Sequence, residues 1–248
     1  MKIVFIIFLC FVTYAPLAKS LNVGFKSYPP FNYYSKDQKL VGLDVDILSA
    51  VAKQANLSIN YRETPWRRTL KYLRTGDINL TMGASYSKER EKYAHFSHAY
   101  RTEKVSLFVK RGSTNQITIT SLSDLAKSNY KFGISDGYYY GPQFQKLYLD
   151  NNFRAHINSV VDLEQNVQML LNNRIDGFLA DTASMQFFIK QNIKLGQFEM
   201  HPLEIYQANI YIMLSRAKHS KESVNKINKA IQVIKNNGQL DKILKHWQ

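Results

Sequence analysis

The stretch GASYSKER at residues 83–90 places small and hydroxyl residues before an arginine, directly after an apolar run. Ser87 is a favoured N-cap residue, so a helix beginning here would leave the backbone N–H groups of residues 83–87 free to bind an anion. Arg90 adds a planar guanidinium that can bind a carboxylate through two parallel hydrogen bonds. The spacing therefore predicts a carboxylate pocket. The alternative is a surface arginine paired with a neighbouring glutamate.

The other residues that could carry chemistry form no catalytic or metal-binding pattern. The sequence contains no G-x-G-x-x-G, G-x-x-x-x-G-K, H-E-x-x-H or G-x-S-x-G motif. His95 and His98 are the only histidines close to each other, and on an extended segment their side chains would point to roughly opposite faces. We therefore expect no metal site, no cofactor and no catalytic residue, and the missing motifs favour a protein that is not an enzyme.

The elements that would position Arg90 alternate between strands and helices. Helical stripes begin at Asp44, which we predict to be an N-cap, and at Trp66, with Gly76 ending the second helix. This alternation predicts βαβ units and a largely parallel sheet, which binds ligands in the crevice at the carboxyl ends of its strands. Strands are predicted at residues 21–27, 78–82, 131–135, 175–180 and 209–214, and further helices near residues 167–171, from 181, at 224–234 and at 240–247.

Residues 1–20 have the features of a secretory signal peptide. Their apolar run at residues 3–12 is too short to span a bilayer. Ala18 and Ser20 place small residues at the −3 and −1 positions, which predicts cleavage after Ser20. Cys10 is the only cysteine and lies inside the run, so the mature chain would have no disulfide and no thiol. We expect the mature protein in the periplasm.

The chain is strongly basic, with a formal net charge of +14. Without Lys2 and Lys19, 31 basic residues remain against 19 acidic ones. The lysines are spread along the chain, and an exported protein seldom meets nucleic acid, so we interpret the charge as a solvated basic surface and expect no nucleic-acid partner.

Four blocks of sequence, in order along the chain, resemble the family 3 solute-binding proteins of polar amino-acid ABC transporters. They are VGLDVDILSAVAKQAN (41–56), GDINLTMGASYSKEREKYAHFSHAY (76–100), RIDGFLADTAS (174–184) and IKNNGQLDKILKHW (234–247). The resemblance covers essentially all of residues 21–248. It implies an α/β, two-lobed periplasmic binding protein-like fold with a two-strand hinge, in which residues 21–102 and 207–248 form a discontinuous lobe 1 and residues 103–206 form lobe 2.

The function that the resemblance implies is capture of a polar amino acid, or a similar small zwitterion or carboxylate, between the two lobes. The lobes would close on the ligand, and a monomer would deliver it to an inner-membrane ABC permease.

The resemblance also implies roles for single residues. Arg90 matches the arginine that binds the α-carboxylate, and Asp181 matches the acid that binds the α-ammonium, although Asp181 is equally placed to cap the helix that follows it. The loop is one residue shorter than the usual family loop, which leaves Ser85 and Tyr86 as alternatives for the residue that faces the ligand. The remaining implied ligand-binding residues are Gly83, the aromatic walls Tyr28 and Trp66, and Gly137, Tyr138 and Tyr139 in the turn DGYYYG.

Two other functions stay open on this fold. A cyclohexadienyl dehydratase-like enzyme would need a general acid in the cleft, for which Asp136, Glu164 and Asp181 are the candidates in lobe 2. A sensing protein would bind the same kind of ligand and act through a membrane partner.

Overall fold

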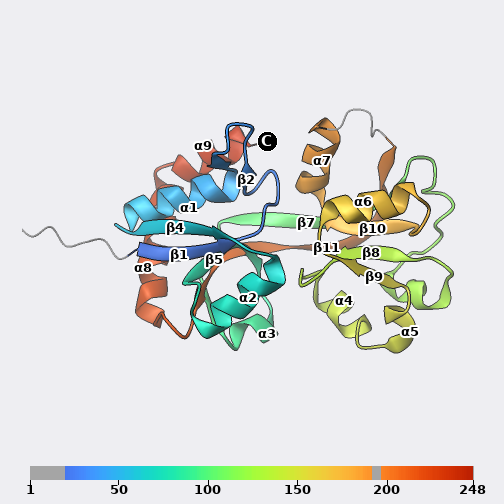
Figure 1. Ribbon diagram of the computed structural model, residues 1–248, viewed down its shortest axis with the longest axis horizontal. Coiled ribbons are helices and arrows are strands. Elements are labelled where there is room, and N and C mark those ends of the chain that lie inside the picture. Colours follow the sequence, from blue (N-terminus) through green and yellow to red (C-terminus); the bar gives the residue numbers. More distant parts are fainter. Residues whose placement is uncertain (1–19, 192–196, 248) are drawn as a thin grey trace, which may run out of the picture.

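The computed structural model describes residues 20–191 and 197–247 and consists of two α/β lobes joined by two long strands (Figure 1). The predicted signal peptide, including Cys10, lies outside the described residues except for Ser20, which begins the first strand. In the described part of the chain, every helix is too short or too polar to cross a membrane.

Lobe 1 is built mainly from the N-terminal part of the chain and is completed by its last two helices. Its elements are β1 Ser20–Phe25, β2 Tyr33–Tyr34, β3 Leu40–Val41, α1 Leu43–Gln54, β4 Ser58–Glu63, α2 Trp66–Thr75, β5 Leu80–Ser85, α3 Lys88–Glu91, β6 Ala94–Phe96, α8 Lys221–Asn236 and α9 Gln239–His246.

Lobe 2 is built from the middle of the chain. Its elements are the 3-10 helix η1 Leu122–Lys127, β8 Phe132–Ser135, α4 Pro142–Leu147, α5 Asn151–Arg154, β9 Ile157–Val160, α6 Leu163–Leu171, β10 Gly177–Asp181 and α7 Thr182–Gln191. Two crossing strands, β7 Arg101–Lys110 and β11 Phe198–Ser215, connect it to lobe 1.

One mixed sheet runs through both lobes in the order β4-β1-β5-β11-β7-β10-β8-β9. The pairs β4–β1 and β1–β5 in lobe 1 and β10–β8 and β8–β9 in lobe 2 are parallel, as the alternation of strands and helices predicts. The pairs of β11 with β5 and β7, and of β7 with β10, are antiparallel. The prediction of a largely parallel sheet is therefore right for the outer strands of each lobe and wrong for the strands that pair with β7 and β11.

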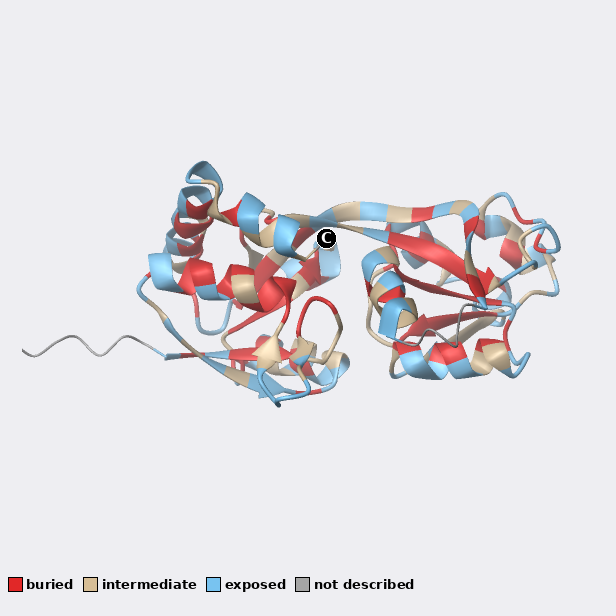
Figure 2. Ribbon diagram, turned by 90° about the horizontal axis from the view of Figure 1, so that it is seen from above, coloured by how far each residue is buried: buried red, intermediate tan, exposed pale blue. Residues whose placement is uncertain are grey.

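The crossing strands β7 and β11 form an antiparallel ribbon that spans the two lobes (Figure 2). Between the lobes, Thr102 pairs with Asn209 and Lys104 with Gln207. The sequence predicted only residues 209–214 of the 18-residue strand β11, because residues 210–214 form a continuous apolar run, whereas the earlier part of the strand mixes buried and exposed residues. The predicted lobe boundaries, at residues 102/103 and 206/207, fall within this ribbon and remain a prediction.

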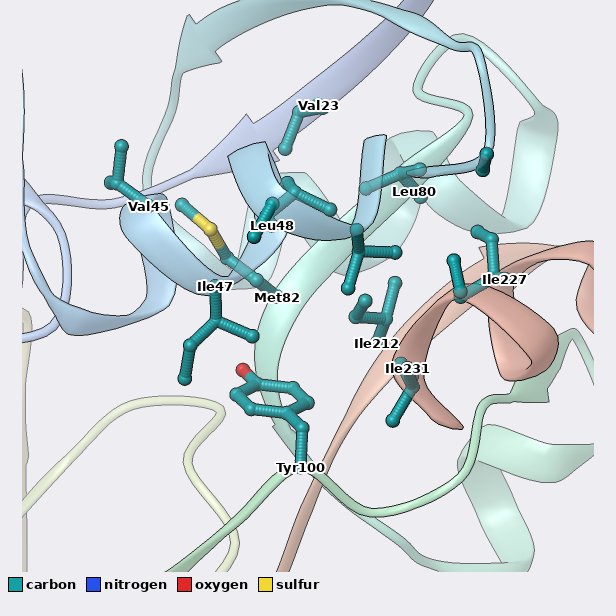
Figure 3. Close-up of a cluster of buried hydrophobic side chains, with 14 of the residues drawn as sticks. Val23, Val45, Ile47, Leu48, Leu80, Met82, Tyr100, Ile212, Ile227 and Ile231 are labelled. Atoms are coloured by element: carbon teal, nitrogen blue, oxygen red, sulfur yellow. The ribbon is translucent and has the colours of Figure 1, made fainter. Parts of the chain in front are cut away.

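The core of lobe 1 forms between α1, the sheet and α8 (Figure 3). Ile47 and Leu48 on α1 pack toward Leu80 and Met82 on β5, and Ile231 on α8 closes the cluster. This is the buried face that the helical stripe after Asp44 predicts. The N-cap, however, is Gly42 and not Asp44, which lies in the first turn and is only 1 % exposed.

Two element boundaries in lobe 1 can be compared with the prediction, and the second of them decides how Ser85 is held. Helix α2 ends as predicted at Gly76, which adopts the left-handed conformation at φ 86°. Strand β5, predicted to end at Met82, continues to Ser85. Ser85 is therefore held by sheet hydrogen bonds and not by a loop.

Candidate functional site

A cavity of about 50 Å³, which we call the cleft cavity, lies between the two lobes. Space of this size holds a few water molecules. Eight of the ten predicted ligand-binding residues line it: Tyr28, Trp66, Gly83, Ser85, Arg90, Tyr138, Tyr139 and Asp181. Four charged residues that the sequence did not single out as ligand-binding also line it: Lys26, Asp44, Arg101 and Glu103.

Arg90 reaches the cleft cavity from the short helix α3. The Ser87 side chain caps this helix as predicted and accepts a hydrogen bond from the Arg90 N–H at 3.2 Å. The guanidinium donates through Nη1 to the Ser85 carbonyl at 2.8 Å and through Nη2 to the Gly137 carbonyl of lobe 2 at 3.1 Å. Arg90 is 6 % exposed and makes no ion pair with any described residue, so it is not a surface arginine paired with a glutamate.

Asp181 reaches the cavity from lobe 2, at the end of β10. Its Oδ1 accepts a hydrogen bond from the Ser184 N–H at 2.9 Å, so the carboxylate also binds the first turn of α7. The side chain is buried, and this burial raises the pKa of Asp181, while the positive charge of Arg101 and the backbone N–H groups at Ser184 and Ala183 lower it. Asp181 therefore combines the two roles that the sequence left as alternatives, a cap and a cavity-lining carboxylate.

Aromatic rings from both lobes enclose the space between these charges. The Tyr28 ring of lobe 1 meets the Tyr138 ring of lobe 2 edge-on, with 5.4 Å between centroids. Trp66 lies 6.0 Å from Tyr138 and donates its indole N–H to the Gly137 carbonyl at 3.1 Å. The cavity thus combines apolar ring surfaces with charged side chains, as expected for a site that binds a small polar ligand.

Glu103 is a cavity residue that the sequence did not reveal. Its Oε1 accepts a hydrogen bond of 2.5 Å from the Ser85 hydroxyl. Burial raises the pKa of Glu103 to about 7, although the Ser85 hydroxyl and the charge of Arg101 act in the opposite direction. Since Ser85 has one hydroxyl proton and donates it to Glu103, it positions this carboxylate and does not donate to a ligand in this structure.

Arg101 and Asp44 form a buried ion pair beside Glu103. Arg101 Nε donates to Asp44 Oδ1 at 2.7 Å, and Arg101 Nη2 donates to Asp44 Oδ2 at 2.9 Å. The guanidinium also lies 3.9 Å from the centroid of the Phe31 ring. This geometry, rather than helix capping, accounts for the acidic residue at position 44.

Comparison with known proteins decides the family. The model of the bacterial extracellular solute-binding proteins, family 3, matches residues 21–248. The chain belongs to this family. This solute-binding protein is 27% identical over 233 residues to the L-cystine-binding protein TcyA of Bacillus subtilis (strain 168), an alignment that covers 92% of this chain and 80% of the relative.

Further similarity links this solute-binding protein to arginine-binding proteins. It is 27% identical to the arginine-binding extracellular protein ArtP of Bacillus subtilis (strain 168) over 232 residues, which cover 92% of this chain and 86% of the relative. The solved structure of an ancestral arginine-binding protein bound to arginine matches 92% of this chain and 97% of its own, with a TM-score of 0.77 and 27% identity. The matching structure also confirms the predicted two-lobed fold.

Two of the ten predicted ligand-binding residues lie outside the lining of the cleft cavity. Tyr86 is 39 % exposed and donates its hydroxyl to Glu91 at 2.6 Å, so between Ser85 and Tyr86 the structure favours Ser85 as the residue in the cavity. Gly137 contributes its carbonyl to Arg90 and Trp66 but no lining surface.

The predicted backbone anion site also needs correction. Residues 83–85 belong to β5, and the Gly83 N–H donates to the Tyr100 hydroxyl at 2.8 Å. Helix α3 contains only four residues. The Gly83 N–H is therefore not free to bind an anion, and the cation that this segment brings to the cavity is the Arg90 guanidinium. In the described part of the chain, no three His, Cys, Asp or Glu side chains are placed to hold a metal ion.

Proposed function

We propose that this solute-binding protein captures a polar amino acid between its lobes and delivers it to an ABC permease. One observation carries the proposal. The Arg90 guanidinium is buried in the cleft cavity without a carboxylate partner among the described residues, while the buried carboxylate of Asp181 lines the same cavity from the other lobe. A buried charge is stable only when an opposite charge or hydrogen bonds compensate it, so the cavity is built to receive an anionic and a cationic group together.

The ligand would bind with its carboxylate at Arg90 and its ammonium at Asp181. Arginine carries five N–H donors, of which the Ser85 and Gly137 carbonyls use two in this structure, so donors remain for a carboxylate. Each charge-assisted hydrogen bond contributes about 1.5–3 kcal/mol net. The rings of Tyr28, Trp66 and Tyr138 would bury the apolar part of the ligand.

Ligand contacts with both lobes would favour the closed arrangement, because a ligand shifts an equilibrium toward the state that it binds better. The lobes already meet around the cavity. Ser184 on α7 donates to the Pro29 carbonyl at 2.6 Å, and Arg67 on α2 pairs with Asp136 at 3.1 Å. Because Arg67 and Asp136 are both exposed, their ion pair contributes about 0–1 kcal/mol. The ligand would add to the less exposed contacts between the lobes, such as those of the Gly137 carbonyl with Trp66 and Arg90.

The proposal extends to the cellular setting of the protein. We propose a periplasmic monomer that is exported by a signal peptide cleaved after Ser20 and docks onto an inner-membrane permease. The family of extracellular solute-binding proteins and the sequence of residues 1–20 support this setting.

We also propose that the protein is not an enzyme. Its named relatives are binding proteins, which supports this part of the proposal. Consumption of prephenate or arogenate by the purified protein would contradict it. Co-purification of a kinase or a chemoreceptor, instead of a permease, would favour the sensing alternative.

Replacement of Arg90 tests the proposed function. A thermal-shift screen of the twenty common amino acids identifies the ligand, since binding raises the melting temperature as RT ln(1 + [L]/Kd). We expect Arg90→Ala to weaken binding of that ligand by about 2–5 kcal/mol in titration calorimetry, the cost of truncating a buried charge pair.

Arg74→Ala is the matched control, because Arg74 is exposed and lies outside the cleft cavity. Its affinity should equal that of the wild type. Equal affinities of wild type and Arg90→Ala would refute the role of Arg90.

A further inference from the structure

The charged side chains that line the cleft cavity are three cations and three carboxylates, but they do not all pair with one another. Six charged side chains line it, and two of them, Asp44 and Arg101, form an ion pair. A third, Lys26, pairs with Asp162 at 3.7 Å. Three groups remain without an oppositely charged partner in the described part of the chain: the cation Arg90 and the carboxylates Glu103 and Asp181.

The two unpaired carboxylates lie on one face of the sheet. Arg101, Glu103 and Val105 alternate along β7, and all three line the cavity. Val105 pairs directly with Asp181 on the antiparallel strand β10. Glu103 and Asp181 are therefore diagonal neighbours, roughly 7–8 Å apart by the geometry of such pairs.

Glu103 is held in place within this arrangement. The Ser85 hydroxyl on β5 fixes one of its oxygens at 2.5 Å. No Lys, Arg or His of the described residues lies within ion-pair distance of its carboxylate. The charged groups that act on Glu103 are Arg90, Arg101 and Asp181. The charge of Glu103 in turn raises the pKa values of the nearby tyrosines Tyr28, Tyr138, Tyr140 and Tyr206.

We propose that Glu103 selects an amino acid with two cationic groups and one carboxylate, and hence a net charge of +1. The inference rests on the proposed function and deepens it. The ligand carboxylate binds Arg90, its α-ammonium binds Asp181, and the second cation binds Glu103. Each unpaired charge of the cavity then has an oppositely charged partner on the ligand. A neutral zwitterion would leave the carboxylate of Glu103 without one.

The protonation of Glu103 agrees with this assignment. Its raised pKa of about 7 reflects a carboxylate that burial penalises and that no nearby cation fully compensates. A ligand cation beside it favours the ionised form. Binding of a net +1 ligand at pH 6 therefore releases a proton, and the affinity rises with pH through about 7.

A second cavity lies next to the cleft cavity, but Glu103 lines only the cleft cavity, so the second cation is placed in the cleft cavity itself. This side cavity has a volume of about 330 Å³ and borders the cleft cavity, and Tyr28 and Tyr138 line both. The rings of Tyr28 and Tyr138 therefore offer apolar surface to the aliphatic stem of a basic side chain whose cation lies beside Glu103.

Arginine and citrulline test the inference, because they have almost the same shape and differ by one charge on the side chain. We expect the wild type to bind arginine more tightly than citrulline in titration calorimetry at pH 8, and Glu103→Gln to reduce this preference about tenfold or more. At pH 6, the binding heat of arginine should depend on the ionisation enthalpy of the buffer in the wild type and lose this dependence in Glu103→Gln.

Two further variants separate selectivity from folding. Glu204→Gln removes an exposed carboxylate that lies outside both cavities, and should keep the preference of the wild type. Ser85→Ala removes only the hydroxyl that positions Glu103, and should lower the preference less than Glu103→Gln does. The melting temperature of each ligand-free variant shows that it is folded.

The outcomes distinguish this inference from the proposed function. Equal affinities of the wild type for arginine and citrulline would overturn the inference. Either Glu103 and Asp181 would then both bind the α-ammonium, or Glu103 would be protonated. Binding of another amino acid would leave the proposed function intact in that case. A wild type that binds none of the amino acids would overturn both.

Discussion

At the scale of single residues, Asp44 shows where rules based on local sequence fail. An aspartate before an apolar helical stripe is a favoured N-cap, and this preference depends on a few neighbouring residues. The carboxylate instead binds Arg101, 57 positions along the chain, through two hydrogen bonds. Neither residue carries a local signal of its partner, so the pair became visible only in the folded chain. Arg90 was predictable because its chemistry and its capping serine lie within four residues.

Replacing Asp44 should strongly destabilise the fold. Asp44→Asn leaves the guanidinium of Arg101 buried without a compensating charge, and we expect the free energy of unfolding to fall by about 3–5 kcal/mol. Urea denaturation of the ligand-free protein measures this difference. Glu89→Gln is the control, because Glu89 is exposed and pairs with Arg74 at 3.8 Å. Its effect on the free energy of unfolding should be much smaller, because solvent screens an exposed ion pair. Similar decreases in the free energy of unfolding of the two variants would show that the buried ion pair of Asp44 and Arg101 stabilises the fold no more than an exposed pair does.

At the scale of elements, helices with a clear apolar stripe were predictable and strands with mixed burial were not. The predicted helix at 224–234 matches α8, where Val224, Ile227, Ile231 and Ile234 are buried on one face. The stripe of α2 and its stop at Gly76 were also right. Strand β7 escaped prediction because its first half alternates charged residues between the cavity and solvent. Glu103 and Arg101 lie on this half of β7. Because the strand was not predicted, these two cavity residues were not predicted either.

The turn between β8 and α4 connects the two lobes through one carbonyl. Gly137 adopts φ 76°, a left-handed conformation, and its carbonyl accepts hydrogen bonds from Trp66 and Arg90 of lobe 1. An alanine in this conformation costs about 1–2 kcal/mol. We expect Gly137→Ala to lower both the melting temperature and the ligand affinity, because relief of the strain moves the carbonyl away from its two donors.

Gly112 offers a matched control for this prediction. It has φ 84°, and an added Cβ atom would meet no atom within 4 Å. Gly112→Ala should lower the melting temperature by a similar amount and leave the affinity unchanged. If the affinities of the two variants are equally reduced, the carbonyl of Gly137 has no specific part in closure.

At the scale of the whole molecule, the crossing strands hold the binding charges at the junction of the lobes. Arg101 and Glu103 lie on β7, next to the segment where Thr102 pairs with Asn209 on β11. Asp44 belongs to lobe 1 and Asp181 to lobe 2. The two-lobed fold followed from four blocks of sequence, whereas the balance of charges in the cleft depends on how both lobes and the ribbon meet.

The stability of the ligand-free protein should therefore depend on pH through Glu103. The pKa of Glu103 is raised from an ordinary value of 4.5 to about 7, so the folded state holds this proton more tightly than the unfolded chain does. Its contribution to the free energy of unfolding is complete below pH 4.5 and is lost as the pH rises to about 7. The loss is at most about 3 kcal/mol, from 1.36 kcal/mol for each unit of pKa.

The comparison of wild type with Glu103→Gln isolates this contribution, because the amide stays neutral at every pH and the other titrating groups cancel. The difference between their free energies of unfolding should be constant below pH 4.5, shift in favour of the variant between pH 4.5 and 7, and level off above. Saturating arginine should reduce this shift, since its second cation compensates the ionised carboxylate in the folded state. A difference that does not change between pH 4 and 8 would show that Glu103 ionises in the folded protein as it does in the unfolded chain, and that the cavity places no demand for a second cation on its ligand.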